Sequence, residues 1–189
     1  MVNMEPFLNP VDIPLFYKYL DNATFYVEFG GGGSTYQAAM RPNIKEIHVV
    51  ESDPYWLKKL QTQLHNIHYH FCDVKTNPNT GGNPGPLCTV ESMKNYSDQI
   101  YHIQNSISQN VIDFILIDGR FRVACALKCF NVIDENCIIA FDDYHTRPQY
   151  HIISNYYTII DTNHKSMVIL KKKNVQPPVM IHNYECIPD

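Results

Sequence analysis

Four consecutive glycines at positions 30–33 follow an apolar and aromatic run and precede a short helical pattern. Residues 24–29 (TFYVEF) are rich in β-branched and aromatic side chains, which predicts a buried strand. Residues 34–40 predict a helix. A strand that passes through glycines into a helix presents backbone N–H groups to a ligand that can approach closely. This order restricts the chain to folds built from strand–turn–helix units, and it indicates a nucleotide-type ligand at the turn.

Strands and helices continue to alternate after the glycines. Such spacing predicts right-handed βαβ units and a parallel sheet. Glu46 to Glu51 (EIHVVE) is the second strand, and Asp53-Pro54 opens the helix that follows it. Further strands are predicted at 67–74, 111–117 and 137–141, and helices at 11–21, 53–64 and 122–132, while residues 90–110 receive no assignment.

The end of the chain departs from this alternation. Residues 156–161 and 166–171 are strand-like, and the four polar residues between them are too few for a crossover helix. Two strands joined so closely must be antiparallel. We therefore predict one α/β domain over residues 1–189, with a core of about 24–172. Its doubly wound, Rossmann-like sheet is mostly parallel and ends in an antiparallel hairpin.

Residues 75–89 (KTNPNTGGNPGPLCT) form the one long irregular segment in the sequence. The segment follows the third strand at the carboxyl edge of the sheet, where ligands of open α/β sheets bind. We expect a lid or a substrate-recognition loop, and the alternative is a tolerated surface insertion. The tail at 174–189 contains prolines and is expected to pack loosely.

Composition excludes several classes of protein. A net charge of −4 disfavours a basic nucleic-acid-binding face, so no nucleic-acid partner is expected. No secretory leader and no membrane-spanning apolar run is visible, which favours a cytoplasmic protein without a membrane partner. Cys125 and Cys129 lie one helical turn apart without a second pair of metal ligands, so we expect them to pack in the core. The oligomeric state is left open.

Acidic residues stand at the ends of the first three strands. Glu28 lies two residues before the first glycine, Glu51 ends the second strand, and Asp73 closes the third. Glu51 offers two acceptor oxygens to a ribose diol. Thr35 occupies the position where a dinucleotide-binding motif has its third glycine. The alternative is a glycine-rich turn that binds no ligand.

The segments YVEFGGGGS, VVESDP, FCDV, FILIDGR and IIAFDDY, with the final hairpin, resemble class I S-adenosylmethionine (SAM) methyltransferases over about residues 24–172. The resemblance implies that Glu28 addresses the charged methionine end of SAM and that Asp73 contacts its adenine. The string DGRFRVACAL also resembles poorly characterised bacterial proteins with a methyltransferase-like fold. The residues implied for SAM binding are Glu28, Gly30, Gly32, Ser34, Glu51, Ser52, Asp73 and Asp118.

A second group of acids follows the fourth and fifth strands. Asp118 ends one strand and Asp142 and Asp143 end the next, so their carboxylates should converge at one edge of the sheet. A hard divalent cation would relieve their repulsion. The spacing resembles metal-dependent, sugar-modifying O-methyltransferases of the macrocin type. That resemblance implies a Mg²⁺ ion that acidifies and orients an acceptor hydroxyl. The alternative is that Asp118 pairs with Arg120 or Arg147 and binds no metal.

The chain departs from the macrocin type directly after Asp118. Where that family has a second acid or a histidine, this chain carries Arg120 and Arg122. Their forked donors suit phosphate or carboxylate and predict a small anionic substrate. His145 is the nearest substitute for the missing base. The predicted catalytic residues are Asp118, Arg120, Arg122 and His145, and the predicted substrate-binding residues are Arg120, Arg122, Asp143 and Arg147.

The leading hypothesis is SAM-dependent O-methylation of a small polar or phosphorylated acceptor, such as a sugar or nucleotide-sugar. Two alternatives keep the same fold. In one, the protein is a nucleotide-sugar-dependent glycosyltransferase with Arg120 and Arg122 on the diphosphate. In the other, it is a ligand-binding module without turnover.

Overall fold

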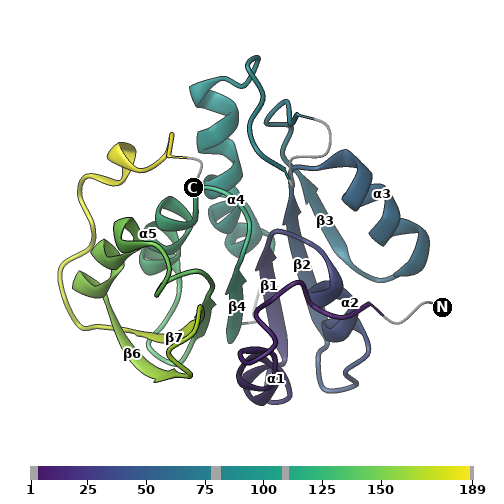
Figure 1. Ribbon diagram of the computed structural model, residues 1–189, viewed down its shortest axis with the longest axis horizontal. Coiled ribbons are helices and arrows are strands. Elements are labelled where there is room, and N and C mark those ends of the chain that lie inside the picture. The colour runs from purple at the N-terminus through teal and green to yellow at the C-terminus, as the bar shows by residue number, and fades with distance from the viewer. Residues whose placement is uncertain (1–3, 78–81, 108–110, 188–189) are drawn as a thin grey trace.

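The computed structural model describes residues 4–77, 82–107 and 111–187. These residues form one seven-stranded sheet with helices on both faces (Figure 1). The strands are β1 (Phe25–Phe29), β2 (Glu46–Glu51), β3 (His68–Phe71), β4 (Phe114–Ile117), β5 (Ile138–Phe141), β6 (Tyr157–Thr162) and β7 (Val168–Lys172). The α-helices are α1 (Ile13–Leu20), α2 (Gly33–Ala39), α3 (Pro54–Gln63), α4 (Val90–Ser106) and α5 (Arg122–Val132), with 3-10 helices η1 (Pro148–Asn155) and η2 (Ile181–Asn183).

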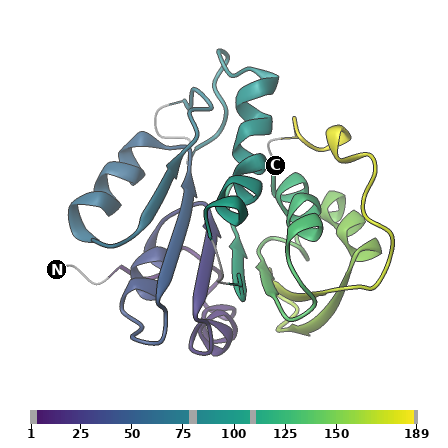
Figure 2. The same ribbon diagram turned by 180° about the vertical axis from the view of Figure 1, so that it is seen from behind.

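The sheet has the strand order β3-β2-β1-β4-β5-β7-β6. Strands β1 to β5 are parallel, whereas β7 runs antiparallel to both β5 and β6. In two opposite views, β3 and α3 lie toward one end of the molecule and the β6–β7 hairpin toward the other (Figure 1, Figure 2). The predicted fold, a mostly parallel doubly wound sheet with a terminal antiparallel hairpin, is confirmed.

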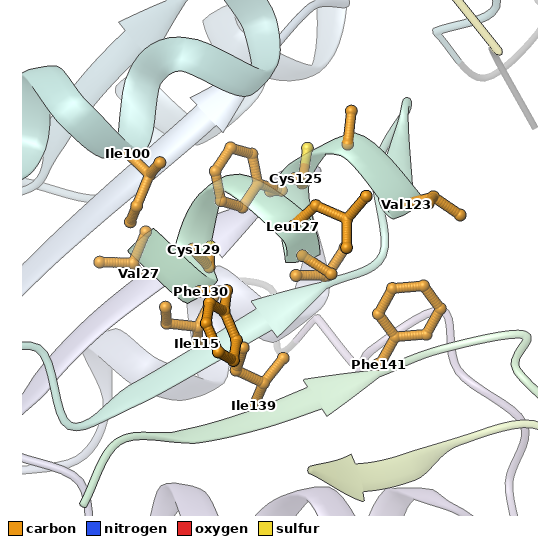
Figure 3. Packing of buried hydrophobic residues seen from close by; sticks show 14 of the residues in the cluster. Val27, Ile100, Ile115, Val123, Cys125, Leu127, Cys129, Phe130, Ile139 and Phe141 are labelled. Atoms are coloured by element: carbon orange, nitrogen blue, oxygen red, sulfur yellow. The ribbon is translucent and has the colours of Figure 1, made fainter. Parts of the chain in front are cut away.

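Two apolar layers enclose the central strands, because successive strand residues point to opposite faces. Every residue of β1 is buried. Val27 and Ile115 face the layer of α4, α5 and η1, and Tyr26 faces the layer of α1 and α2. Figure 3 shows side chains of α5 packed over β4 and β5. Cys125 and Cys129 are fully buried in this layer, which confirms the prediction that they pack in the core.

The register of the parallel strands brings their carboxyl ends to one level. Phe29, the last residue of β1, pairs with Val50 on one side and Ile117 on the other. Ile117 in turn pairs with Phe141, the last residue of β5. The residues that follow these four strands therefore emerge along the same edge of the sheet, where the predicted site residues lie.

Helix α4 is an element that the sequence pattern did not predict. Thr89 caps it, since its hydroxyl accepts a hydrogen bond from the backbone N–H of Ser92 at 3.1 Å. Tyr96, Ile100 and Ile103 are its fully buried apolar residues, a narrow stripe among polar side chains that weakens the helical signal. Among the described residues, no helix is long and apolar enough to cross a membrane.

Part of the C-terminal tail packs more tightly than predicted. Glu185 is 9% exposed, and its Oε1 lies 2.7 Å from Nζ of Lys128 on α5. The same ammonium group lies 2.7 Å from Oδ1 of Asp98 and donates to Oγ of Ser97 at 2.9 Å, both on α4. Lys128 thus joins α5, α4 and the tail, so the expectation of a loosely packed tail is wrong at this point.

We expect Lys128→Met to lower the free energy of unfolding by about 3 kcal/mol, because it leaves the carboxylates of Asp98 and Glu185 without their shared buried cation. Urea denaturation followed by circular dichroism measures the loss. Lys58→Met, at an exposed position of α3, is the matched control and should change stability little. Equal stability of the two variants would contradict a joining role for Lys128.

Candidate cofactor and acceptor site

A cavity of about 910 Å³ opens at the carboxyl edge of the sheet. One wall consists of the glycine turn at residues 30–33 together with Glu51 and Ser52. Residues 118–120, which lie next to the glycine turn, and residues of the turn after β5 also line the cavity. Open α/β sheets bind their ligands in this position. The cavity therefore joins the two groups of residues that the sequence predicted to be functional.

The glycine turn owes its shape to a close approach of two backbones. Gly30 has φ +97°, and a Cβ on it would lie 2.6 Å from Cα of Gly119. Any other residue would therefore force the ends of β1 and β4 apart. Gly32 differs, because a Cβ there would meet no protein atom within 4 Å and its φ of −177° is extended. Gly32 leaves room beside the cavity where a ligand can approach the backbone.

Glu28 lies behind the glycine turn and is fully buried. Its carboxylate accepts hydrogen bonds from the hydroxyls of Ser34 and Thr35, the latter at 2.5 Å. Thr35 Oγ1 in turn accepts from the backbone N–H of Gly32 at 3.0 Å. Burial raises the pKa of Glu28 from 4.5 to about 8. Glu28 thus fixes the start of α2. The Ser34 side chain lies between Glu28 and the cavity.

Glu51 faces the cavity and ties the glycine turn to the start of α3. Its Oε2 accepts from the N–H of Gly31 at 2.7 Å, and its Oε1 accepts from Ser52 and Asp53 at 2.6 Å each. A carboxylate has about four acceptor positions, so these bonds leave room for a ligand hydroxyl. Burial raises the pKa of Glu51 to about 7.

Asp73 and the segment 75–89 lie differently from what the sequence predicted. Asp73 is exposed, accepts from the N–H of Lys75 at 2.8 Å, and does not line the cavity. No described residue of 75–89 lines the cavity either, although a Cβ on Gly82 would lie 3.2 Å from Oγ of Ser52. Residues 78–81 of the predicted lid lie outside the described residues. The lid therefore stays a prediction.

The N-terminal segment covers the glycine turn instead. Residues 4, 5 and 7–9 line the cavity, and a Cβ on Gly33 would lie only 1.9 Å from the carbonyl oxygen of Glu5. Trp56 and Lys59 of α3 complete this side, with the Lys59 ammonium 4.3 Å from the centre of the Trp56 ring. None of these residues was predicted from the sequence, because long-range packing and not a local motif brings them to the site.

Arg122 lies among the three aspartates that were predicted to bind Mg²⁺. Its guanidinium nitrogens lie 3.1 Å from Oδ1 of Asp118, 3.5 Å from Oδ2 of Asp142 and 3.2 Å from Oδ2 of Asp143. Among the described residues, these acids do not form a group whose ligand atoms all come within 4.8 Å of one another. The prediction of a magnesium site is therefore not supported. Asp118 forms an ion pair with Arg122.

Asp118 lines the cavity and has a raised pKa. Burial raises its pKa well above the ordinary range. The neighbouring carboxylates of Asp142 and Asp143 raise it further, while the positive charge of Arg122 opposes this shift. Together these effects favour the protonated form of Asp118 relative to an exposed aspartate.

The other predicted residues divide between the cavity and its surroundings. His145 does not line the cavity, and its Nε2 lies 2.9 Å from Oγ1 of Thr162 on β6. Arg147 does line it, pairs with Oδ2 of Asp143 at 3.0 Å and donates to the hydroxyl of Tyr150 at 3.0 Å. Arg120 lies on the wall beside Asp118. Of the two candidate bases, Asp118 lines the cavity and His145 does not.

Comparison with known proteins identifies the fold. No protein-family model and no curated protein matches the chain. A methyltransferase-like protein from Silicibacter pomeroyi is 23% identical, with 93% of this chain and 92% of that chain covered at a TM-score of 0.73. The N-methyltransferase NodS from Bradyrhizobium japonicum, solved with S-adenosylhomocysteine, is 10% identical over 88% and 89% at 0.52. The ribosomal protein L11 methylase from Lactobacillus delbrueckii is 13% identical over 90% and 84% at 0.53. The chain has the fold of class I methyltransferases.

Protonation of Glu28 should make stability depend on pH. Between about pH 5 and pH 8 the unfolded chain ionises Glu28 while the folded chain keeps its proton, so stability falls as pH rises. One such group contributes a slope of up to about 1.4 kcal/mol per pH unit. We expect Glu28→Gln to remove that contribution, as measured by urea denaturation across this range. Glu135→Gln, at an exposed position, should keep the wild-type slope; identical slopes in both variants would show that Glu28 is ionised when folded.

Proposed function

We propose that this protein is a SAM-dependent methyltransferase with its cofactor site in the cavity between the glycine turn and Glu51. The observation that carries the proposal is the Glu51 carboxylate, which is anchored by the N–H of Gly31 and faces the cavity. A carboxylate in this position suits the two hydroxyls of a ribose. The fold of the solved methyltransferases supports the same assignment, and NodS among them holds S-adenosylhomocysteine.

The remaining residues of this wall suggest how the cofactor would lie. Ser34 lines the cavity next to the glycine turn, so the methionine end would lie there, with Glu28 holding Ser34 from behind. Ser52, beside Glu51, would border the adenosine part. Asp73 stays a predicted adenine contact, which its exposed position outside the cavity wall does not support.

Methyl transfer to an oxygen requires a base on the acceptor side. SAM, when bound, supplies an electrophilic methyl group on a sulfonium sulfur. Asp118 would take the proton of the acceptor hydroxyl with its ionised carboxylate, because this side chain lines the cavity. Arg122 would balance the negative charge of the three aspartates, the role that the sequence analysis gave to Mg²⁺.

We further propose a small polar acceptor that carries a phosphate, such as a sugar phosphate or a nucleotide-sugar. Lys59, Arg120 and Arg147 all line the cavity and bring positive charge to its walls. A guanidinium matches the oxygens of a phosphate through paired hydrogen bonds. Arg122 is less suited to this task because carboxylates surround it, and Arg147 shares its charge with Asp143. Arg120 lies on the cavity wall beside Asp118, so we propose that it contributes to binding the phosphate.

The cofactor proposal predicts a specific effect of Gly32→Ala. The added methyl group meets no protein atom, so the variant should unfold at the wild-type temperature. The same methyl group would stand where the ligand approaches the backbone, so we expect S-adenosylhomocysteine to bind more weakly by at least about tenfold. Isothermal titration calorimetry measures the affinity. Wild-type protein that binds neither SAM nor S-adenosylhomocysteine, while a nucleotide-sugar raises its melting temperature, would replace this proposal with the glycosyltransferase alternative.

The acceptor proposal predicts an effect of Arg120→Gln on the acceptor alone. With methyl-labelled SAM, we expect label to enter phosphorylated sugars or nucleotide-sugars in preference to their unphosphorylated counterparts. Arg120→Gln should raise the KM for the phosphorylated acceptor by roughly tenfold or more and leave the Kd for S-adenosylhomocysteine unchanged. Equal labelling of glucose and glucose 6-phosphate would contradict the proposed acceptor class without affecting the cofactor proposal.

A further inference from the structure

A group of histidines lies on β2 and β3, outside the cofactor cavity. Glu46 and His48 alternate along β2, and His68 and His70 alternate along β3, so all four point to the face of the sheet that α4 covers. The register pairs His48 directly with His68. Two neighbouring parallel strands thus place three imidazoles and one carboxylate side by side.

The distances within this group suit a metal ion. Oε1 of Glu46 lies 2.9 Å from Nε2 of His48 and 3.9 Å from Nε2 of His68. The three residues are the group among the described histidines, cysteines and acids whose ligand atoms all lie within 4.8 Å of one another. Ligands of a tetrahedral zinc ion at its usual bond lengths are about 3.3 Å apart. The rings of His48 and His68 stack with centres 4.5 Å apart, so the exposed His68 side chain would turn to direct its nitrogen at the same ion.

A neighbouring residue orients the buried ligand. His48 is 2% exposed and stacks on Phe25, with ring centres 5.2 Å apart. Its other ring nitrogen, Nδ1, lies 2.9 Å from Nε2 of His70. When Nε2 of a histidine binds a metal, its Nδ1–H needs an acceptor that fixes the ring, and His70 stands in that position. The surroundings of His48 thus match those of a metal-binding histidine.

We propose that Glu46, His48 and His68 bind one Zn²⁺ ion. Two imidazoles and a carboxylate favour zinc over Mg²⁺ or Ca²⁺, which prefer oxygen ligands alone. The His68 side chain is 60% exposed, so the ion can enter from solvent and keep a water molecule as its fourth ligand. Glu46 lies five residues before Glu51 on β2, roughly 16 Å along the strand, so the zinc site is separate from the cofactor cavity.

Such an ion would join the edge strand to the sheet. β3 is the first strand in the sheet order and pairs on one side only, with β2. A zinc ion held by both strands adds a link at the beginning of this pairing. Because the ion binds the folded strands and not the separated ones, its binding energy stabilises the folded protein. The site depends on neither the proposed cofactor nor the proposed acceptor.

Titration of the chelator-treated, full-length protein tests the zinc site. We expect one equivalent of Zn²⁺ to bind and raise the melting temperature, and Mg²⁺ to have no such effect. His68→Gln and Glu46→Gln should each weaken zinc binding by more than roughly tenfold and abolish the rise in melting temperature. Both substitutions change partly exposed side chains, so the variants should fold. His65→Gln, at an exposed position just before β3, is the matched control and should bind zinc like the wild type.

Cobalt substitution reports on the ligands themselves. Co²⁺ in a four-coordinate site with two imidazoles should give a visible absorption band, which His68→Gln should remove and His65→Gln should keep. Zinc affinity and stoichiometry that are unchanged in both His68→Gln and Glu46→Gln would overturn the proposal, because the ion would then bind elsewhere. Failure of the wild-type protein to bind zinc would overturn it as well.

Discussion

The site depends on the close contact between the backbones of Gly30 and Gly119. This contact lets β1 and β4 end side by side, so that the turns after them open toward the same cavity. Because strands β1, β2, β4 and β5 end at one level, the residues that follow them lie along one edge of the sheet. This backbone arrangement determines where Glu51, Asp118 and Arg120 lie, and their positions determine what they can bind.

The charges on the acceptor side follow from one buried arginine. A guanidinium keeps its proton at any ordinary pH, so Arg122 brings a permanent positive charge to Asp118, Asp142 and Asp143. Burial raises the pKa of Asp118, and the neighbouring carboxyls of Asp142 and Asp143 raise it further, because one positive charge does not neutralise three acids. The same arrangement removes the reason for a divalent cation, since the repulsion that would recruit one is already reduced.

Local patterns in the sequence predicted the sheet well, because buried strands and glycine turns have strong signals. The mostly parallel sheet, the terminal hairpin and the places of Glu51 and Asp118 at the strand ends followed from those signals. Interactions between distant segments could not be predicted in this way. The ion pairs of Arg122 and the N-terminal segment over Gly33 depend on tertiary packing. Helix α4 has only a narrow apolar stripe, so its local signal is weak. The magnesium site was predicted for this reason and is not supported. Three acids at neighbouring strand ends give the same sequence pattern whether or not an arginine lies between them.

Strand β2 links the two proposed sites. Its first half carries Glu46 and His48 on the α4 side, and its last residue, Glu51, contacts the glycine turn. The backbone carbonyl of Glu51 also accepts from the N–H of Cys72, just after β3. A zinc ion that fixed β3 to β2 at their beginning would therefore support the same pairing that ends beside Glu51. Strand β3, which pairs with β2 alone among the described strands, would then be held at its beginning by the ion and just after its end by this hydrogen bond.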